Sequence, residues 1–320
     1  MGEVTISTQG LRKSFGAVEA LRGVDITAHA GTVLGLLGHN GAGKSTLVHI
    51  LSTLLQPTSG SATVAGFDVR TQSREIRKRI GVTAQHTSVD GRLSAVANLV
   101  LIARILGSRP RAARRKAGEL VDAFGLGAAA DRPARTYSGG MRRRLDLAMS
   151  LVADPVVLFL DEPTTGLDPV SRVNLWEIVE GLAGNGTTVL LTTQDLNEAD
   201  RLADRIAVLS AGAVVASGTT ADLKEETGSR SVHVAIDHAE PARAIAALRL
   251  HGFQPTQEAD ERRLLIPVDA SADLAGIVQI LVAADCTIEN LALSEPTLDD
   301  VYLSLTSAGR GASHPTRSTA

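Results

Sequence analysis

The sequence predicts an α/β fold in which a large domain with a mainly parallel sheet is followed by a smaller α/β domain. Short apolar runs alternate with helical patterns over the first two thirds of the chain, an order typical of parallel sheets. Some runs, such as residues 156–160, are continuously apolar, as in strands buried on both faces. The alternation stops at the polar stretch 223–228 and then resumes. We therefore predict domains at residues 1–222 and 229–307. We expect a disordered tail at 308–320, which is polar and rich in small residues.

The elements of the first domain follow from periodicity. Continuous apolar runs predict strands, and apolar residues recurring every three or four positions predict helices. Residues 93–124 and the stretch behind Ser138 show the helical pattern, so we expect a helical subdomain at about 90–150. In chain order the expected elements are strand 33–37, helix 45–51, strand 80–84, helices within 93–124, a helix after 138, strand 156–160, a helix containing Leu175, Ile178, Val179 and Leu182, strand 187–193, and a hairpin of 206–210 with 213–216.

The second domain reads as alternating strands and helices without chemistry of its own. It contains no carboxylate pair, glycine-rich loop or metal-ligand spacing, so we expect an accessory or regulatory role. The expected order is strand 231–236, helix 241–250, strand 264–268, helix 274–284, strand 288–293 and helix 297–305.

The composition excludes several classes of protein. At 44% hydrophobic, 320 residues can bury a substantial core. A formal net charge of −3 with 2% aromatic residues gives no general attraction to nucleic acid and few platforms for stacking bases, so we expect no nucleic-acid partner. The single cysteine, Cys286, excludes an internal disulfide. The first residues lack a signal-peptide pattern and the apolar runs are too short to span a bilayer. Any membrane association should therefore need a partner.

A glycine-rich loop follows the strand at 33–37. Its residues are Gly38, His39, Asn40, Gly41, Ala42, Gly43, Lys44, Ser45 and Thr46. This fits the phosphate-binding loop pattern, in which backbone N–H groups surround a triphosphate, the lysine reaches the β/γ-phosphates and the serine hydroxyl binds Mg²⁺. An ordinary glycine-rich turn is the alternative. The strand before the loop and the helix after it favour the phosphate site.

Residues 138–140 form a second candidate anion site. Ser138 is a good N-cap, and Gly139 and Gly140 leave backbone N–H groups open at the start of an apolar-patterned helix. One nucleotide does not need two triphosphate sites on the same chain. The economical interpretation is that this site serves a nucleotide held by another subunit.

Two carboxylates, Asp161 and Glu162, end the buried strand at 156–160. Adjacent carboxylates are costly at such a position unless a cation is bound there. We therefore predict that Asp161 holds Mg²⁺ and that Glu162 polarises the attacking water. The alternative, a plain turn at a strand end, is disfavoured beside a phosphate loop.

Three other features are open to two interpretations on local grounds. Phe15 can stack on a nucleotide base or belong to the core, and the phosphate loop downstream favours stacking. Gln85, at the end of the strand near 80–84, looks like a solvated loop residue. The basic run 109–116 can contact phosphate, RNA or lipid headgroups, but such runs are more often a solvated helix face.

In this order, the motifs resemble those of the ATP-binding subunits of ABC transporters. GHNGAGKST at 38–46 is similar to the Walker A loop, and VVLFLDEP at 156–163 is similar to Walker B with its catalytic glutamate, Glu162. SGGM at 138–141 resembles the signature that binds the γ-phosphate of ATP held by the opposite subunit. The resemblance covers about residues 4–220. It implies a P-loop NTPase core of ABC type with a helical signature subdomain.

The resemblance also implies roles for residues outside these motifs. Gln85 stands where the family has a glutamine that contacts the metal and the permease, Phe15 matches the adenine-stacking aromatic, and Asp168 belongs to the D-loop. Gln194 stands where the family usually has a switch histidine. Its carboxamide can hydrogen-bond the γ-phosphate or the water, but it cannot titrate near neutral pH. Met141 replaces the usual glutamine of the signature.

A closer resemblance is to the daunorubicin/doxorubicin-resistance type of ABC ATPase, through YSGGMRRRLD, LLTTQ and EPTLDDVYLSLT. It implies a homodimer that holds two ATP molecules with Mg²⁺, an integral-membrane permease as partner, and a place on the cytoplasmic face of the membrane. The implied activity is ATP hydrolysis that powers export of a hydrophobic or amphipathic drug. One alternative is a soluble ABC-type ATPase acting on ribosomes or DNA, although the single, uninterrupted cassette argues against it. A binding module without catalysis is disfavoured because Glu162 is present.

Overall fold

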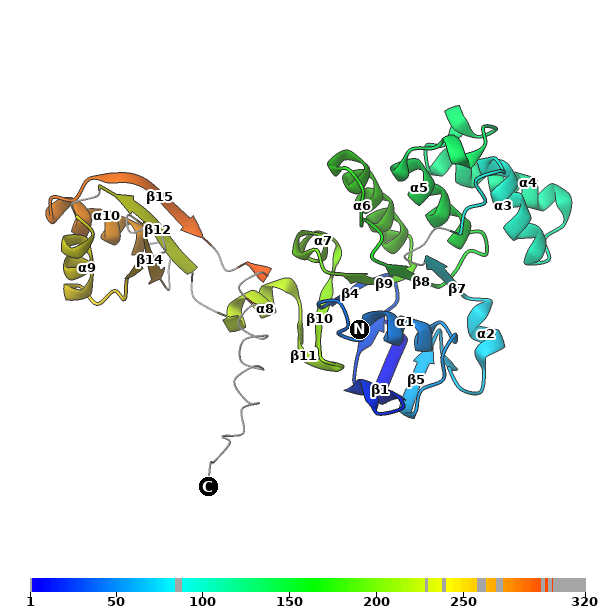
Figure 1. The fold of residues 1–320 in the computed structure, drawn as a ribbon, viewed down its shortest axis with the longest axis horizontal. Coiled ribbons are helices and arrows are strands. Elements are labelled where there is room, and N and C mark those ends of the chain that lie inside the picture. Colours follow the sequence, from blue (N-terminus) through cyan, green and yellow to red (C-terminus); the bar gives the residue numbers. More distant parts are fainter. Residues whose placement is uncertain are drawn as a thin grey trace, which may run out of the picture. The chain divides into compact units, whose positions relative to one another are not determined.

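The structure is a computed structural model that describes residues 2–83, 88–227, 230–237, 240–257, 263–268, 273–294, 297–298 and 301. The chain divides into two compact units, Met1–Thr220 and Ala221–Ala320. Each unit has its own sheets and helices (Figure 1).

A six-stranded sheet forms the centre of the first unit. Its order is β11-β10-β4-β9-β8-β7, and neighbouring strands are parallel except for the β10/β11 hairpin. This confirms the predicted, mainly parallel sheet. All residues of β4, β8 and β9 are buried, which explains their continuous apolar sequences. The strands are β4 (Val33–Leu37), β7 (Ile80–Thr83), β8 (Val157–Asp161), β9 (Thr188–Thr193), β10 (Arg205–Ser210) and β11 (Ala213–Gly218).

A second sheet, which is antiparallel, contains the first strands of the chain. The order is β2-β1-β5-β6, and β3 also pairs with β1. Its strands are β1 (Val4–Phe15), β2 (Val18–Val24), β3 (Thr27–His29), β5 (Ser59–Val64) and β6 (Phe67–Asp68).

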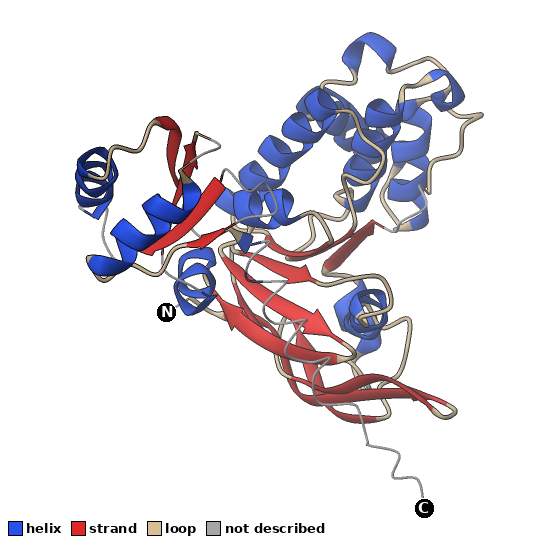
Figure 2. Cartoon of the chain, turned by 60° about the vertical axis from the view of Figure 1, so that its left-hand side comes forward, coloured by secondary structure: helices blue, strands red, loops and turns tan. Residues whose placement is uncertain are grey.

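The helices of the first unit divide into two groups. Three of them, α3 (Ala95–Ile105), α4 (Pro110–Ala123) and α5 (Gly139–Ser150), lie together at one end of the unit, away from the antiparallel sheet (Figures 1 and 2). Short 3-10 turns at Gly127–Ala129 and Ala134–Thr136 lie between α4 and α5. The others connect strands: α1 (Lys44–Leu51), α2 (Ser73–Arg77), α6 (Pro169–Gly184) and α7 (Leu196–Leu202).

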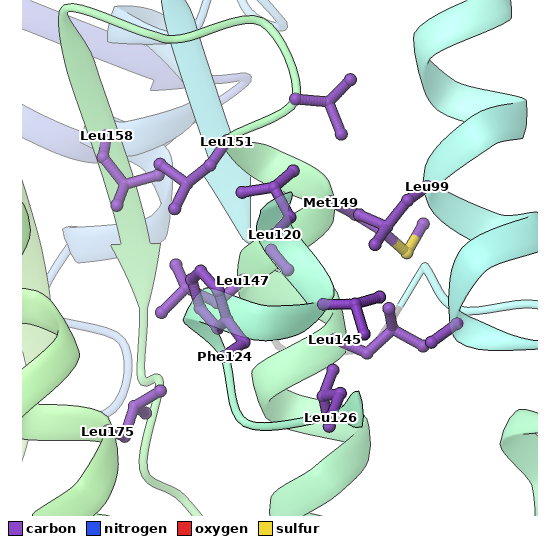
Figure 3. Close-up of a cluster of buried hydrophobic side chains, with 14 of the residues drawn as sticks. Leu99, Leu120, Phe124, Leu126, Leu145, Leu147, Met149, Leu151, Leu158 and Leu175 are labelled. Carbon is purple, nitrogen blue, oxygen red and sulfur yellow. The ribbon is translucent and has the colours of Figure 1, made fainter. Parts of the chain in front are cut away.

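The core of the first unit lies on both faces of the parallel sheet. Along β8, Leu158 and Leu160 belong to one apolar cluster, whereas Val157 and Phe159 belong to the other, as the alternation of side chains along a strand requires. The first cluster joins the sheet to the helical group: Figure 3 shows Leu158 of β8 and side chains of α3, α4 and α5 within this one cluster. The second cluster includes α1 and the antiparallel sheet. The helix α1 after the glycine-rich loop and the helical group are therefore packed on the two faces of the same sheet.

The second unit is a small α/β structure with its own core. Its sheet order is β13-β14-β12-β15, and the pairs are antiparallel. Its elements are β12 (Arg230–Ile236), α9 (Pro241–Leu250), β13 (Thr256–Gln257), β14 (Arg263–Val268), α10 (Asp273–Ala283) and β15 (Ile288–Ser294), and α8 (Thr220–Thr227) precedes them. Buried residues of β12, β14, α9 and α10 pack together. The short β13 was not predicted. Most of the helix expected at 297–305, and the tail expected at 308–320, lie outside the described residues.

Within the described part of the chain, no helix combines the length and apolarity needed to cross a bilayer.

Candidate nucleotide-binding site

The loop between β4 and α1 has a shape that requires glycine at two positions. A Cβ on Gly38 would lie 2.4 Å from the carbonyl oxygen of Leu209, which is far below contact distance. Gly43, which precedes α1, has φ +110°, and a Cβ there would lie 2.7 Å from the carbonyl oxygen of Ala20. Glycine permits both the conformation and the close approach. The loop therefore turns tightly enough to present its N–H groups at the start of α1.

The loop lines a pocket of about 140 Å³. Glu162 contributes from the end of β8, so residues far apart in sequence meet here. Gly38 and Ala42 do not line it, and Ala42 is fully buried. The lining residues are Ala20, His39, Asn40, Gly41, Gly43, Lys44, Ser45, Thr46 and Glu162. The pocket thus gathers most of the predicted phosphate loop around one lysine and one carboxylate.

Lys44 is buried in this pocket, with 5% of its surface exposed. Its Nζ donates to the carbonyl oxygens of Gly38 at 2.6 Å and His39 at 3.2 Å, and lies 3.7 Å from Oε1 of Glu162. Burial lowers the pKa of Lys44, and attraction to Glu162 and Asp161 opposes that shift. The structure therefore places a desolvated amine where a bound anion would meet it.

The two predicted carboxylates lie at the carboxyl end of β8, beside β9. Asp161 is buried and accepts a hydrogen bond from Oγ1 of Thr192, its partner in the sheet register. Glu162 has φ +48°, and its N–H donates to the carbonyl oxygen of Thr192 at 3.0 Å. Oε1 of Glu162 accepts a hydrogen bond from Nε2 of Gln194 at 2.9 Å. The ends of two parallel strands thus bring Asp161, Glu162 and Gln194 together, as expected for this class of sheet.

A second pocket, of about 340 Å³, lies at the carboxyl ends of β8 and β9. Glu162 lines both pockets, and Gln194 lines this one with Thr164, Thr165, Gly166, Arg172, Thr193 and Asp195. Arg172 and Asp195 form an ion pair at 3.0 Å. Glu162 is therefore the group that the two pockets share.

The signature residues form a separate cluster with Asp168. Ser138 is the N-cap of α5, as predicted, and its Oγ accepts a hydrogen bond from the N–H of Met141 at 3.2 Å. A Cβ on Gly140 would lie 2.3 Å from Oγ of Ser171. That hydroxyl donates to Oδ2 of Asp168 at 2.6 Å, and the bonds from Ser171 hold the pKa of Asp168 below its usual value. Neither Ser138 and its glycines nor Asp168 lines the Lys44 pocket.

Phe15, a predicted contact of the nucleotide, is not joined to the pocket. Phe15 ends β1, has 48% of its surface exposed and lies 4.9 Å, measured from its ring centroid, from Nζ of Lys13. It is not among the residues that line the Lys44 pocket. Gln85 lies in the stretch 84–87, outside the described residues.

Sequence reasoning missed Thr192 and Arg143. Thr192 looks like any β-branched residue of a buried strand, and local sequence does not mark its bond to Asp161. Arg143 contacts the turn around Glu162. A signal for Arg143 does exist: it lies three residues after Gly140 and four before Leu147, both buried, so helical periodicity places it on the buried face. Asp146, three residues further along the helix, is the partner that such a charge needs.

Comparisons with known proteins decide the family. A family model described as ABC transporter matches residues 21–165. The chain is 48% identical over 312 residues to the daunorubicin resistance ATP-binding protein DrrA3 of Streptomyces coeruleorubidus, an alignment that covers 97% of this chain and 98% of that protein. The chain belongs to the ATP-binding proteins of ABC transporters. This ABC ATPase is also 41% identical to the doxorubicin resistance ATP-binding protein DrrA of Mycobacterium tuberculosis, with 95% and 94% of the two chains covered.

Solved structures confirm the predicted fold class. An ATP-binding subunit of an ABC transporter matches 69% of this chain and 92% of its own, with a TM-score of 0.63 and 25% identity. A dimeric ATP-binding cassette bound to ADP and Pi matches 67% of this chain and 98% of its own, with a TM-score of 0.61 and 24% identity. The protein is thus an ATP-binding and ATP-hydrolysing cassette of ABC type followed by a second α/β unit.

Proposed function

We propose that this ABC ATPase powers export of a hydrophobic or amphipathic, drug-like compound through a separate membrane permease. The observation that carries the proposal is the position of Glu162, which lies 3.7 Å from Lys44 in one pocket and accepts a hydrogen bond from Gln194 in the next. The chain is also similar over nearly its full length to resistance proteins. The permease would hold the protein at the cytoplasmic face of the membrane. Acidic net charge and a single cassette give no support to an action on ribosomes or DNA.

In this proposal the nucleotide lies along the loop of residues 38–46. Lys44 neutralises the β/γ-phosphates, and Phe15 stacks on the adenine. Mg²⁺ fits the oxygen donors that are present, because it favours hydroxyls, carboxylates, phosphate oxygens and water. Ser45 lines the pocket, and Asp161 is close enough to Lys44 to attract its charge. The described residues contain no cluster of three His, Cys, Asp or Glu side chains, which suits an ion held partly by phosphates. Gln85 would complete this site.

The proposed chemistry is attack of water on the γ-phosphorus, which breaks its bond to the β–γ bridging oxygen and releases ADP and phosphate. Glu162 acts as general base and Gln194 holds its carboxylate, 2.9 Å away. The bound Mg²⁺ would supply charge neutralisation of the phosphates. A second copy of the chain would supply Ser138, Gly139 and Gly140 to the γ-phosphate, with Asp168 next to them. We also propose that residues 229–307 act as an accessory or regulatory domain.

The experiment that tests this function is Glu162→Gln, assayed for ATP hydrolysis in the full chain co-expressed with its permease. Removing a positioned base lowers turnover by roughly 10²–10⁴-fold, while the amide keeps the shape of the site and ATP still binds. A panel of amphipathic drugs should stimulate the wild-type ATPase. Turnover close to wild type in Glu162→Gln would overturn the assignment of the base, and no response to any transported compound would count against drug export.

A further inference from the structure

The buried guanidinium of Arg143 lies against the backbone turn that carries Glu162. Arg143 is in the second turn of α5, with 7% of its surface exposed. Its Nε donates to the carbonyl oxygen of Pro163 at 2.7 Å. Its Nη2 donates to the carbonyl oxygens of Asp161 at 3.2 Å and Glu162 at 3.3 Å. One side chain therefore holds three consecutive carbonyl groups at the end of β8, a task suited to the planar, multiple-donor guanidinium.

The turn around Glu162 needs such support. Glu162 has φ +48°, in the left-handed region that residues other than glycine adopt at a cost. Its carboxylate lies 2.9 Å from Nε2 of Gln194 and 3.7 Å from Nζ of Lys44. Because the backbone sets the direction of this side chain, a relaxed turn would move the carboxylate away from both neighbours.

Asp146 completes the arrangement. Its Oδ2 lies 3.4 Å from Nη1 of Arg143, and its Oδ1 accepts a hydrogen bond from the N–H of Ser88 at 2.9 Å. Burial lowers the pKa of Arg143 and raises the pKa of Asp146. Two buried charges of opposite sign stabilise one another, and either one alone would be destabilising. The pair therefore joins α5 to the Glu162 turn and to the backbone of Ser88.

The same helix connects this pair to the signature residues. Ser138 caps α5 five residues before Arg143. A short helix moves as a rigid body, so a displacement of Ser138 on a second copy's nucleotide would be carried to the carbonyl groups that Arg143 holds. This gives the α5 helix a direct mechanical connection to Glu162 within one chain.

We propose that Arg143 is a positioning residue for ATP hydrolysis, which holds Glu162 in its active direction and couples it to the position of α5. The inference rests on the proposed role of Glu162 as general base. Arg143 contacts the carbonyl groups behind Glu162 and does not line the Lys44 pocket. Its loss should therefore lower turnover and leave nucleotide affinity largely unchanged.

The test replaces the pair without leaving a lone buried charge, as Arg143→Met with Asp146→Leu in the full chain. We expect kcat to fall by about 10- to 100-fold, the scale of a misplacement of about 1 Å at a reacting centre. The KM for ATP and the affinity for a fluorescent ATP analogue should stay within about threefold. A kcat within twofold of wild type would overturn the inference, and so would an equal loss of affinity and turnover, roughly tenfold or more in each.

The matched control is Arg144→Met, one residue further along α5. Arg144 donates to the carbonyl oxygen of Phe124 at 3.0 Å, inside the helical group and away from the Glu162 turn. Its kcat should stay within about twofold of wild type. A loss as large as that of the Arg143 variant would show that any disturbance of α5 suffices, and would overturn the specific role of Arg143.

A second measurement separates this inference from the proposed function. In a Glu162→Gln background, replacing the Arg143–Asp146 pair should lower the remaining turnover by less than about twofold, because the group being positioned is already gone. Multiplication of the two separate losses would overturn the inference while leaving the base assignment intact. Wild-type turnover in Glu162→Gln alone would overturn the proposed function instead.

Arg143→Lys is a milder variant that tests the inference even if the pair replacement does not fold. Lysine retains the buried charge but cannot hold three carbonyl groups with one planar fork. We expect a kcat reduction of about 3- to 10-fold with the KM for ATP unchanged, intermediate between wild type and the pair replacement. Wild-type kcat in this variant would contradict the inference.

Discussion

The glycine-containing N-termini of α1 and α5 differ in their surroundings. Other residues of this chain enclose the first, whereas the second is exposed. At the start of α1, Lys44 is buried, faces Glu162 across a pocket and is enclosed by the loop before it. At the start of α5, Gly139 is exposed. Apart from its chain neighbours and the backbone of its own helix, no described atom lies within 4 Å of a Cβ placed on Gly139. The first site therefore contains a lysine, a carboxylate and the loop residues that enclose them. The second has an exposed face open to a ligand or another chain.

The difference explains why one chain has two such sites. The Lys44 site has the lysine, the carboxylates and the hydroxyl that a magnesium triphosphate needs. The Ser138 site offers backbone N–H groups and a hydroxyl at a helix start, which suit a phosphate group that arrives from outside. In the proposed function the two sites are complementary halves that meet when two copies of the chain associate, so variants at each should affect different steps.

The largest effect is expected at the enclosed half, from Lys44→Met. Removing one partner of a buried charge pair costs about 2–5 kcal/mol, and here it also leaves Glu162 and Asp161 without their cation. We expect kcat/KM for ATP to fall by about 30- to 5,000-fold, together with loss of ATP binding by the separated chain. Retained binding of an ATP analogue, measured by fluorescence titration, would contradict the site at Lys44.

At the exposed site at the start of α5, Gly139→Asp should leave ATP binding unchanged and lower turnover, the opposite of the effect of Lys44→Met on binding. The added side chain meets open space, so the melting temperature and ATP binding by the separated chain should match wild type. Turnover should fall by about 10²-fold, because a carboxylate would face the phosphates of the second copy's nucleotide. Gly140→Ala is a contrasting variant: its Cβ would lie 2.3 Å from Oγ of Ser171, so it should lower the melting temperature. Normal turnover in Gly139→Asp would remove the signature from the active site.

A smaller effect is expected from Gln194→Ala, which removes the hydrogen bond to Oε1 of Glu162. Hydrogen bonds to charged groups contribute about 1.5–3 kcal/mol, so turnover should fall by about 10-fold or more while ATP still binds. In Gln194→His, turnover should acquire a pH dependence near the ordinary imidazole pKa of about 6.5, which the amide of the natural residue cannot give. Steady-state rates from pH 5.5 to 8.5 measure both variants. Unchanged turnover in Gln194→Ala would exclude Gln194 from the site.

The smallest effect concerns stability, at Glu198. This carboxyl is buried and accepts a hydrogen bond from Nε1 of Trp176 at 3.3 Å, and burial raises its pKa. Folding therefore favours its protonated form, and its contribution to stability falls as pH rises through the raised pKa. Glu198→Gln removes this dependence. The melting temperature of Glu198→Gln minus that of the wild type should increase from pH 5 to pH 7. The increase should be about 2–4 °C for each kcal/mol that ionisation of Glu198 costs the folded wild type. A difference independent of pH, followed by thermal unfolding, would contradict this account.

The sequence was sufficient to predict where the carboxylates of the candidate site lie. Continuous apolar runs indicated parallel strands, and the carboxyl ends of parallel strands share one edge of the sheet. Asp161 ends one such strand, and Glu162 and Gln194 directly follow two of them. The structure brings Glu162 within 3.7 Å of Lys44 and 2.9 Å of Gln194. Local pattern and a general rule of sheet geometry carried the prediction for Asp161 and Glu162, whereas the role predicted for Gln194 came from the family resemblance.

Contacts between residues far apart in the sequence were not predictable in the same way. Arg143 reaches carbonyl groups 18 to 20 residues away, and Thr192 of β9 bonds to Asp161 of the neighbouring β8, so neither contact leaves a local pattern.

The strand pairing of the second unit was also not predictable from the sequence. Its strands alternate with helices, yet β12 pairs with β14 and β15 in antiparallel fashion. Alternation therefore predicts the elements of a small α/β unit without deciding how its strands pair.

The most direct test of complementary halves is the association state of the Glu162→Gln chain, measured by analytical ultracentrifugation with its permease present and absent. With Mg²⁺ and saturating ATP the mass of the ATPase should double relative to the nucleotide-free chain. The same chain carrying Gly139→Asp should stay monomeric. A Glu162→Gln chain that remains monomeric with ATP in both settings would contradict the account.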